Sequence, residues 1–541
     1  MIAMPPINNA NETVGSADSI FNKFKEHSIS EFFKKNKQML GYSGLAHSMV
    51  TIVHEYVTNS LDACEEAGIL PEITVSIKDA GENKYWISIE DNGPGIPKKY
   101  IGKALATILA GTKFNSYKQQ RGQQGIGAAG CTLFSSMTTG KPIHIESTTL
   151  NESYACDLSI NTIDNTPVVS NMSDINHSGT GLKVEGVFGE IKYERGDRGV
   201  YEYLKRTALV NPHCQIAFID PESEKYIFTR SINAIPKKPK EVKPHPLGLS
   251  INDIIEFSQV SQEKKISTFL QNSFTRVSPK KIEELRKVCN IDFDKPPSEI
   301  NWDDAEMLIN AFKKIDWIAP DASSLSILGK SQIKTTVLNI LNPEYISVTE
   351  RKPKVFYGGI PFIIESAIAI GGNAGKKTED NDYTSNIMRF ANKVPLLFDA
   401  GSCAITEAVK KVSWKRYDID LEKQPVSIMV NMSSIYIPYS GVGKESIQQD
   451  QSIVNEIKFA LMDCAREMHH YLKNKERDKI EMSKYKSIIK YVDHLSSDLA
   501  FITDMDRGMI KEKLSTLVES HYIKKKDIEE TDSGESGEQV I

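Results

Sequence analysis

The stretch His54-Glu-Tyr-Val-Thr-Asn-Ser-Leu-Asp-Ala63 decides how the rest of this chain is interpreted. It lies in a run of apolar residues spaced three and four apart, which predicts an amphipathic helix. Glu55 and Asn59 are four residues apart, so both side chains extend from one face of that helix. A carboxylate can accept a proton from water, and a carboxamide oxygen can ligate Mg²⁺. On this stretch alone, an ordinary solvated helix face is the simpler interpretation.

Two strands and a tight turn follow the helix. Residues 73–77 and 85–90 alternate apolar and polar side chains, which predicts an antiparallel hairpin. The second strand leads into Asp91, which can accept a hydrogen bond from an exocyclic amine. Gly93 and Gly95 permit a tight turn and a close approach to a flat ligand. For Asp-Asn-Gly-Pro at 91–94 in isolation, a plain turn is the better interpretation, but the combination with the preceding helix is more informative.

A glycine-rich segment occupies residues 111–130 and ends in a run of small residues that predicts the start of a helix. Exposed amides at a helix N-terminus bind phosphate, so this loop is a candidate phosphate cradle. Gly125, Gly127 and Gly130 also match the spacing of the dinucleotide fingerprint. That fingerprint requires a preceding apolar strand, and the preceding residues 115–121 are polar and basic.

Composition limits the class of protein and its compartment. A length of 541 residues predicts roughly three domains, and 40% hydrophobic with 25% charged residues is typical of a soluble globular chain. The polar start is not a secretory signal, and no apolar run is as long as a membrane span. Seven scattered cysteines without a CxxC pair indicate reduced thiols, so we expect a cytoplasmic protein, nucleoid-associated in a prokaryote. A net charge of -5 restricts any DNA contact to local basic patches.

Pattern and composition divide the chain into successive segments. These are a flexible polar arm (1–20), an α+β sandwich (21–235), a basic proline-rich linker (236–246), a small helical domain (247–322), a third domain (323–480), a C-terminal helical region (481–526) and an acidic tail expected to be disordered (527–541).

The third domain contains two features that matter later. Residues 387–398 predict a single strand, and a long helix is expected from residue 445 to about residue 478, roughly 50 Å in length. Lys444 would then stand at a helix N-terminus, where the macrodipole disfavours a cation unless an anion is bound. A P-loop is excluded, because Glu445 occupies the place of the Ser or Thr that holds Mg²⁺.

The order and spacing of four motifs resemble the GHKL ATPases, a family that includes gyrase, heat-shock chaperones, histidine kinases and MutL. The motifs are His54-Glu55-x-x-x-Asn59, Asp91-x-Gly93-x-Gly95, the glycine loop 122–130 and Gly179-Thr180-Gly181. Gly-Thr-Lys-Phe at 111–114, the loop itself and residues 387–398 are most similar to topoisomerase VI B subunits. The resemblance implies an α+β multidomain fold with a GHKL (Bergerat) sandwich, a helix–two-turns–helix domain, and an α/β transducer domain with a long C-terminal helix.

The resemblance also implies roles for individual residues. Glu55 would be the general base that polarises water, and Asn59 would ligate Mg²⁺. Asp91 would hold the adenine amino group of ATP, and Lys444 would reach the γ-phosphate from the transducer. The remaining residues that it implies in nucleotide binding are Gly93, Gly95, Thr112, Lys113, Gly122, Gln123, Gln124, Gly125, Ile126, Gly127, Ala128, Ala129 and Thr180.

By the same resemblance, the chain is expected to be the ATP-hydrolysing subunit of a type IIB DNA topoisomerase. ATP would make two copies dimerise and gate the passage of double-stranded DNA. The sequence has no acidic cluster typical of a Toprim fold, so a separate A subunit in an A2B2 heterotetramer would cleave DNA. The alternatives are another GHKL machine such as a MutL-like repair ATPase, or a nucleotide-gated DNA clamp without turnover.

Overall fold

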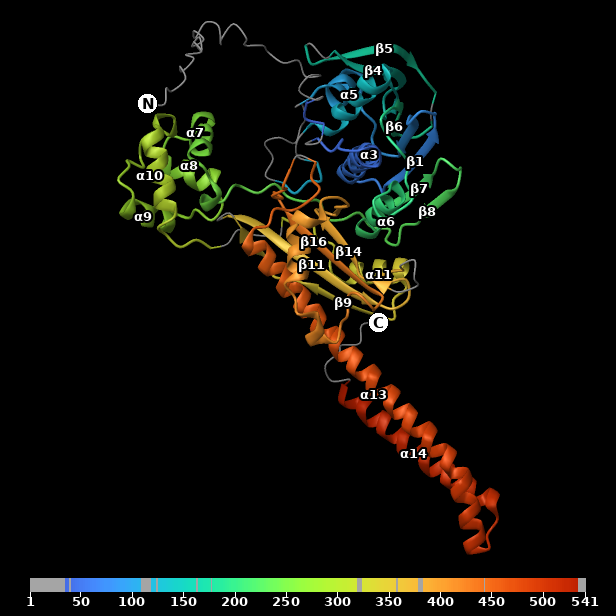
Figure 1. Cartoon of the computed structure of the whole chain (residues 1–541). Helices are drawn as coiled ribbons and strands as arrows, with labels where there is room; N and C mark the ends of the chain where they lie inside the picture. The colour runs from blue at the N-terminus through green and yellow to red at the C-terminus, as the bar shows by residue number, and fades with distance from the viewer. Residues whose placement is uncertain are drawn as a thin grey trace, which may run out of the picture.

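The computed structural model describes residues 35–37, 40–108, 118–122, 125–161, 164–176, 178–318, 324–356, 359–377, 383–441 and 443–533, with side chains as far as residue 520. Three bodies follow one another along the chain (Figure 1). An N-terminal α+β body sits above a second α/β body, and a small helical cluster lies to one side. A long helical hairpin projects from the second α/β body, away from the other two.

The N-terminal body is built on an eight-stranded sheet in the order β5-β4-β3-β6-β2-β1-β7-β8. The hairpin expected from the alternating pattern is present, with Ile73 of β1 paired to Asp91 of β2. The last strand, β8, was not anticipated from the sequence. The strands are β1 (Glu72–Asp79), β2 (Tyr85–Asp91), β3 (Ile143–Thr148), β4 (Ser153–Asn161), β5 (Thr166–Asp174), β6 (Gly181–Phe188), β7 (Gln215–Ile219) and β8 (Lys225–Phe228).

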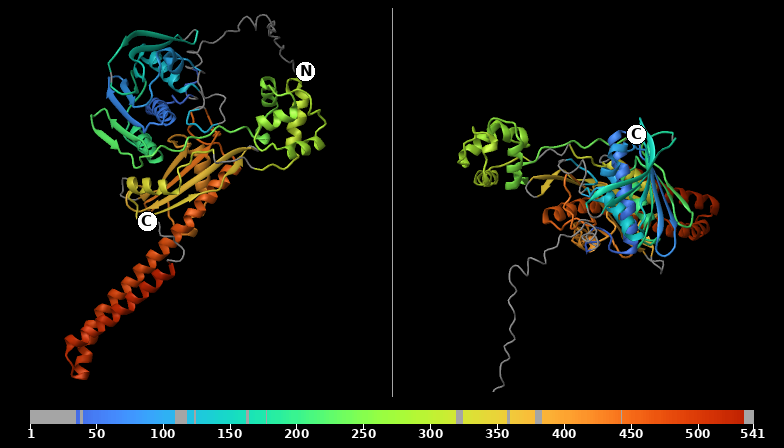
Figure 2. Two further views of the ribbon diagram at one scale, coloured as in Figure 1. Left: turned by 180° about the vertical axis from the view of Figure 1, so that it is seen from behind. Right: turned by 90° about the horizontal axis from the view of Figure 1, so that it is seen from above.

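Helices cover one face of this sheet, and α3 (Leu45–Ala67) is the helix predicted around Glu55. Seen from above, α3 stands against the twisted strands (Figure 2). Its apolar stripe, including Val53 and Val57, is fully buried in the core with Val75 from the sheet. Gly68 ends the helix in the left-handed conformation with φ 78°. The other helices of this body are α4 (Ile101–Ala106), α5 (Gly127–Thr139) and α6 (Val200–Val210).

The small helical domain expected at 247–322 is present, and its described residues form four α-helices. Phe269, Phe274, Phe293 and Phe312 make the centre of its separate core. Ser250 begins the first of these helices in a capping box. The helices are α7 (Ile251–Val260), α8 (Ile266–Ser273), α9 (Pro279–Val288) and α10 (Trp302–Phe312). Its assignment as a helix–two-turns–helix domain stays a prediction.

The second α/β body has a six-stranded sheet in the order β10-β11-β16-β14-β15, with β9 paired to β11. A separate core forms where the long C-terminal helix packs on this sheet. The elements are β9 (Tyr345–Glu350), β10 (Lys354–Phe356), β11 (Ile360–Ile370), β14 (Asn386–Ala391), β15 (Val394–Pro395), β16 (Val426–Ser434), α11 (Lys330–Leu341) and α12 (Ala404–Lys410), with a short pair β12 (Lys376–Lys377) and β13 (Tyr383–Thr384).

The single strand predicted over residues 387–398 is wrong. The structure divides it into β14 and β15, which pair antiparallel across a two-residue turn. Asn392 and Lys393 occupy the turn with φ values of 48° and 64°. Both values lie in the left-handed region that a tight hairpin of this length requires. The apolar pattern did not reveal the turn, because neither glycine nor proline marks it.

The long helix begins later and ends later than predicted. Helix α13 (Gln451–Thr503) has 53 residues, about 80 Å at the usual rise. Asp450 is its N-cap and accepts the Ser452 amide at 2.8 Å. Lys444 therefore lies in a loop before the helix, and the macrodipole argument made for it does not apply. The expected boundary at residue 480 falls inside this helix.

Helix α14 (Arg507–Ser533) runs back along α13 and completes the projecting hairpin (Figure 1). It extends into the segment expected to be a disordered tail, since residues 527–533 are helical. Residues 534–541 and the N-terminal arm lie outside the described residues. Within the part of the chain that is described, no helix has the length and apolar character that crossing a membrane requires.

Candidate functional site

A cavity of about 690 Å³ opens between α3 and the elements around it. The glycine loop, the turn after β2 and a loop of the second α/β body all contribute to its wall. The residues that line it are Glu55, Tyr56, Asn59, Ser60, Ala63, Ile89, Asp91, Pro94, Gly95, Ile96, Pro97, Tyr100, Lys103, Ala104, Leu105, Gly122, Gly125, Gly127, Ala128, Ala129, Leu182, Val184 and Lys444.

Glu55 and Asn59 both reach this cavity from α3, as their spacing predicts. The Glu55 side chain is 18% exposed, and His54 Nε2 lies 4.0 Å from Glu55 Oε1. Burial lowers the pKa of His54, so this ring is neutral at physiological pH. Among the described residues, neither the Glu55 carboxylate nor the Asn59 carboxamide has a hydrogen-bond partner. Both groups therefore keep free oxygen atoms to offer to water or a cation.

The glycine loop brings the start of α5 against Glu55. A Cβ atom at Gly127 would lie 1.8 Å from Glu55 Oε2, so a larger residue here would have to displace the Glu55 carboxylate. Ile126 precedes the helix and supplies no side-chain acceptor to its first amides. The first residues of α5, Gly127 to Ala129, line the cavity, and free amides at a helix N-terminus bind phosphate.

Asp91 ends β2 and lines the cavity beside α3. Its two carboxylate oxygens accept the Ser60 hydroxyl at 2.6 Å and the Gly93 amide at 2.9 Å. Burial raises the pKa of Asp91, and these hydrogen bonds oppose that effect. Gly95 has φ 69°, and a Cβ there would lie 2.3 Å from the Thr148 carbonyl oxygen. The turn therefore fixes the Asp91 carboxylate as a hydrogen-bond acceptor in the wall of the cavity.

Lys444 enters the cavity from a loop that Ser440 and Ser446 close with a backbone hydrogen bond of 2.9 Å. Lys444 itself has φ 54°, a conformation that is unfavourable for a residue with a side chain. The next residue, Glu445, forms an ion pair with Nε2 of His47 on α3. The His47 ring also packs on Phe398, with the two ring centroids 3.9 Å apart. The loop is thus attached to α3 directly beside the lysine.

Comparison with known proteins gives a consistent result. A model of the topoisomerase VI B subunit transducer matches residues 320–484, and a model of histidine kinase-, DNA gyrase B- and HSP90-like ATPases matches residues 44–161. The type 2 DNA topoisomerase 6 B subunit of Methanothermobacter thermautotrophicus is 42% identical over 499 residues, which cover 91% of this chain and 95% of that one. Its counterpart in Pyrococcus horikoshii is 39% identical over 570 residues, covering 96% and 99%.

The chain belongs to the family of type 2 DNA topoisomerase 6 B subunits. Its N-terminal body is a GHKL ATPase domain, and its second α/β body is the transducer. The solved ATPase region of Saccharomyces cerevisiae topoisomerase II covers 84% of this chain and 100% of its own length at 12% identity, but a TM-score of 0.39 is too low to support an argument.

Most residues that the sequence assigned to nucleotide binding meet in the cavity of this topoisomerase family member. Gly93 supports Asp91 without lining the cavity, and Ile126 and Thr180 are not among the lining residues. Thr112, Lys113, Gln123 and Gln124 lie outside the described residues, so their roles stay predictions.

Sequence reasoning missed several residues that line the cavity or support its wall. Ser60 adjoins Asn59 and holds Asp91, which the packing of α3 beside β2 makes possible. Tyr100 and Lys103 follow the turn after β2 and line the cavity from the start of α4. Their spacing of three residues is the available signal, because a helix starting after this turn would present both on one face.

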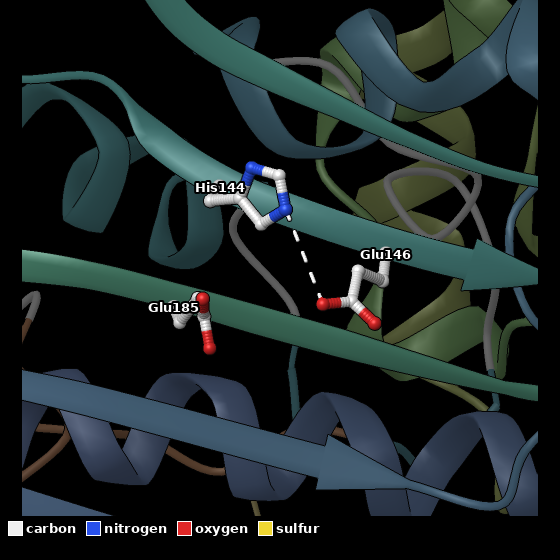
Figure 3. A group of neighbouring side chains, drawn as sticks. All are labelled: His144, Glu146 and Glu185. Atoms are coloured by element: carbon white, nitrogen blue, oxygen red, sulfur yellow. Dashed lines mark ion pairs between the residues drawn. The ribbon is translucent and has the colours of Figure 1, made fainter. Parts of the chain in front are cut away.

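A second group of potential metal ligands lies elsewhere on the ATPase domain. His144 and Glu146 come from β3 and Glu185 from β6, and their side chains gather on the face of the sheet away from the core (Figure 3). Lys183 Nζ already lies 2.9 Å from Glu146 and 3.0 Å from Glu185. The ammonium group takes the place that a cation would occupy, so we assign no metal to this cluster.

Proposed function

We propose that the cavity binds ATP together with Mg²⁺, and that ATP turnover there drives a type IIB DNA topoisomerase. The single observation that carries the proposal is the convergence of Glu55, the α5 N-terminus and Lys444 on one cavity. A base, a phosphate cradle and a cation from a second domain are what hydrolysis and its coupling to movement require. Family membership supports the same reaction.

Glu55 acts as the general base. Its carboxylate accepts no hydrogen bond from a described residue, and the nearby His54 is kept neutral by burial. The carboxylate can therefore orient a water molecule and take its proton as the water attacks the γ-phosphate. The α5 amides meet the negative charge of the phosphates, and Asp91 accepts a hydrogen bond from the adenine amino group.

The donor set fits Mg²⁺. Asn59 supplies an amide oxygen without a partner among the described residues, beside the Glu55 carboxylate and within the cavity. Mg²⁺ prefers oxygen ligands and is held through one or two protein groups together with substrate phosphates. Asn59 would hold the ion, which neutralises charge on the phosphates when it is bound.

Lys444 contacts the γ-phosphate and reports its presence to the transducer. A lysine attracts a phosphate group strongly in a site from which water is partly excluded. Hydrolysis removes this contact, so the ATP-bound and product-bound states favour different placements of the Lys444 loop. Dimerisation of two chains on ATP binding, and their assembly with two copies of a DNA-cleaving A subunit, would convert this difference into passage of double-stranded DNA.

The direct test is ATP hydrolysis by the purified full chain. Glu55→Ala is expected to lower kcat by roughly 10²- to 10⁴-fold, the usual contribution of a general base. Glu66→Ala is the matched control, because Glu66 is an exposed carboxylate on the same helix. Wild-type hydrolysis by Glu55→Ala would remove the proposed base. Nucleotide binding without hydrolysis by the wild-type chain would favour a clamp without turnover.

The topoisomerase proposal needs a separate experiment. Supercoiled DNA is incubated with ATP and the chain, with or without a co-expressed A subunit that carries a nucleophilic tyrosine. We expect relaxation only with both subunits and ATP, and none with Glu55→Ala. Failure of the two subunits to pass one duplex through another would contradict this part of the proposal.

A further inference from the structure

Residues 119–121, which lead directly into the glycine loop, are each tied to one turn of the transducer. The turn is Asn392–Lys393, between β14 and β15. The Gln120 carbonyl accepts a hydrogen bond from Asn392 Nδ2 at 3.1 Å. The Arg121 guanidinium donates to Asn211 Oδ1 at 2.6 Å, and Asn211 Nδ2 donates to the Lys393 carbonyl at 3.1 Å.

Gln119 completes the connection through Ser326. Its carboxamide bonds both backbone groups of Ser326, donating to the carbonyl at 3.1 Å and accepting from the amide at 2.6 Å. The Ser326 hydroxyl in turn accepts a hydrogen bond from Lys393 Nζ at 2.8 Å. Gly122, which follows Arg121 in the chain, lines the nucleotide cavity. A displacement of this turn would therefore be transmitted to the cavity wall.

Burying Lys393 at this position costs folding free energy. It is 5% exposed, and no carboxylate among the described residues lies within ion-pair distance of its ammonium group. Its backbone has φ 64°, which is also unfavourable. Burial lowers its pKa to about 8, although the more distant Glu65 and Glu365 favour the charged form and Arg121 opposes it.

An apolar side chain of similar length would fill this site with less desolvation. Replacing buried charges by well-packed apolar groups is often neutral or stabilising for a fold. A contribution to fold stability therefore does not explain why an amine is buried here. Its hydrogen bond to Ser326 instead orients the residue that holds Gln119.

We propose that Lys393 is a positioning residue for ATP turnover, which sets the approach of the glycine loop to the cavity through Ser326 and Gln119. The inference rests on the proposed ATP turnover at that cavity. A shift of about 1 Å in a positioning group can lower a rate by roughly 10²-fold without any direct contact with the reacting atoms. Lys393 would thereby make the fit of the nucleotide depend on the placement of the transducer.

The test combines kinetics with stability in the full chain. Lys393→Met removes the charge and the donor while keeping a side chain of similar length. We expect kcat/KM for ATP to fall by about 10- to 100-fold, while the melting temperature stays equal to that of the wild type or rises. Lys183→Met is the control, because Lys183 pairs with Glu146 and Glu185 on the distant face of the sheet; its kinetics should match those of the wild type.

A double-mutant cycle locates the effect. Gln119→Leu breaks the other end of the connection, so the double variant with Lys393→Met should be no slower than the slower single variant. Additive losses, unchanged kinetics in Lys393→Met, or a parallel loss of stability and kcat/KM would each overturn the positioning role.

Calorimetric binding of a non-hydrolysable ATP analogue with Mg²⁺ separates this proposal from the proposed function. If the wild-type chain binds the analogue but does not hydrolyse ATP, turnover fails as a function. A binding constant about 10-fold weaker in Lys393→Met would then still show that Lys393 positions the glycine loop for nucleotide binding, and an unchanged constant would reject that role.

Discussion

Two of the places where the ATPase domain meets the transducer differ in burial and in chemistry. Under the glycine loop, Arg121 and Lys393 are both buried and every link is a hydrogen bond between protein groups. At the Lys444 loop, the His47–Glu445 pair is partly exposed, with 12% and 23% of the two side chains accessible. The described residues place no carboxylate within ion-pair distance of Lys444 itself.

This difference indicates that the two contacts have different functions in coupling nucleotide binding to the transducer. The buried contact is made between protein groups alone. Under the proposed function, a nucleotide with a γ-phosphate gives Lys444 an interaction that the product lacks. Because a ligand shifts a conformational equilibrium only through differential contacts, the second place can sense the nucleotide and the first can transmit its state.

The largest expected effect comes from removing the sensing cation. Lys444→Met should lower kcat for ATP by roughly 10²- to 10³-fold, the typical loss for one group that stabilises charge in a transition state. Affinity for a non-hydrolysable ATP analogue should change much less, since the phosphates keep the α5 amides. Steady-state ATPase assays and calorimetry measure both quantities. Lys423→Met, at an exposed lysine of the transducer, should match the wild type.

If Lys444→Met lost binding and hydrolysis in equal measure, Lys444 would contribute to holding the nucleotide and would not act as a sensor. The contrast between the two contacts would then disappear.

An intermediate effect is expected on stability at alkaline pH. The pKa of Lys393 is about 8 in the folded chain and 10.5 for an unperturbed lysine. The unfolded chain therefore binds more protons at this residue between about pH 8 and pH 10.5, and the contribution of Lys393 to the free energy of unfolding rises with pH in that window. The total is about 3 kcal/mol.

Denaturant unfolding of wild-type chain and Lys393→Met at pH 7 and pH 10 measures this contribution. The advantage of the variant should be largest at pH 7 and shrink toward pH 10. Parallel stability profiles for the two proteins would mean that the buried amine does not titrate in this range.

The smallest effect is expected at the partly exposed pair. His47→Ala frees Glu445 and removes the packing on Phe398, so the Lys444 loop should be held less firmly. We expect kcat to fall by about 3- to 10-fold, with no further loss when Lys444→Met is already present. His144→Ala is a close control, because His144 Nδ1 also bonds a carboxylate, Asp157, at 2.7 Å but on the distant face of the sheet. An equal loss in both histidine variants would remove the special role of His47.

Local sequence patterns predict the elements that place Glu55, Asn59 and Asp91 at the cavity. The apolar spacing of α3 placed Glu55 and Asn59 on one face, and the alternating hairpin placed Asp91 at a strand end. Both signals act over a few residues, where period and turn chemistry are informative. The nucleotide assignment itself came from resemblance to a family, since each motif alone had an ordinary explanation.

Long-range contacts were beyond these local signals. No periodicity relates Gln119 to Ser326, or His47 to Glu445, because tertiary packing alone brings them together. The position of Lys444 in a loop was missed for a different reason. The apolar repeat continues before the helix, at Ile447, whereas Asp450, a favourable N-cap, begins α13.

The most direct test of the account is whether one nucleotide contacts both the ATPase domain and the Lys444 loop. Hydrogen–deuterium exchange of the full chain with Mg²⁺, with and without a non-hydrolysable ATP analogue, measures this. The account predicts that the analogue slows exchange both at residues 91–97, after β2, and at residues 443–447, in the Lys444 loop. Protection at residues 91–97 without any change at residues 443–447 would contradict it, because the nucleotide would then occupy the ATPase domain without engaging the transducer.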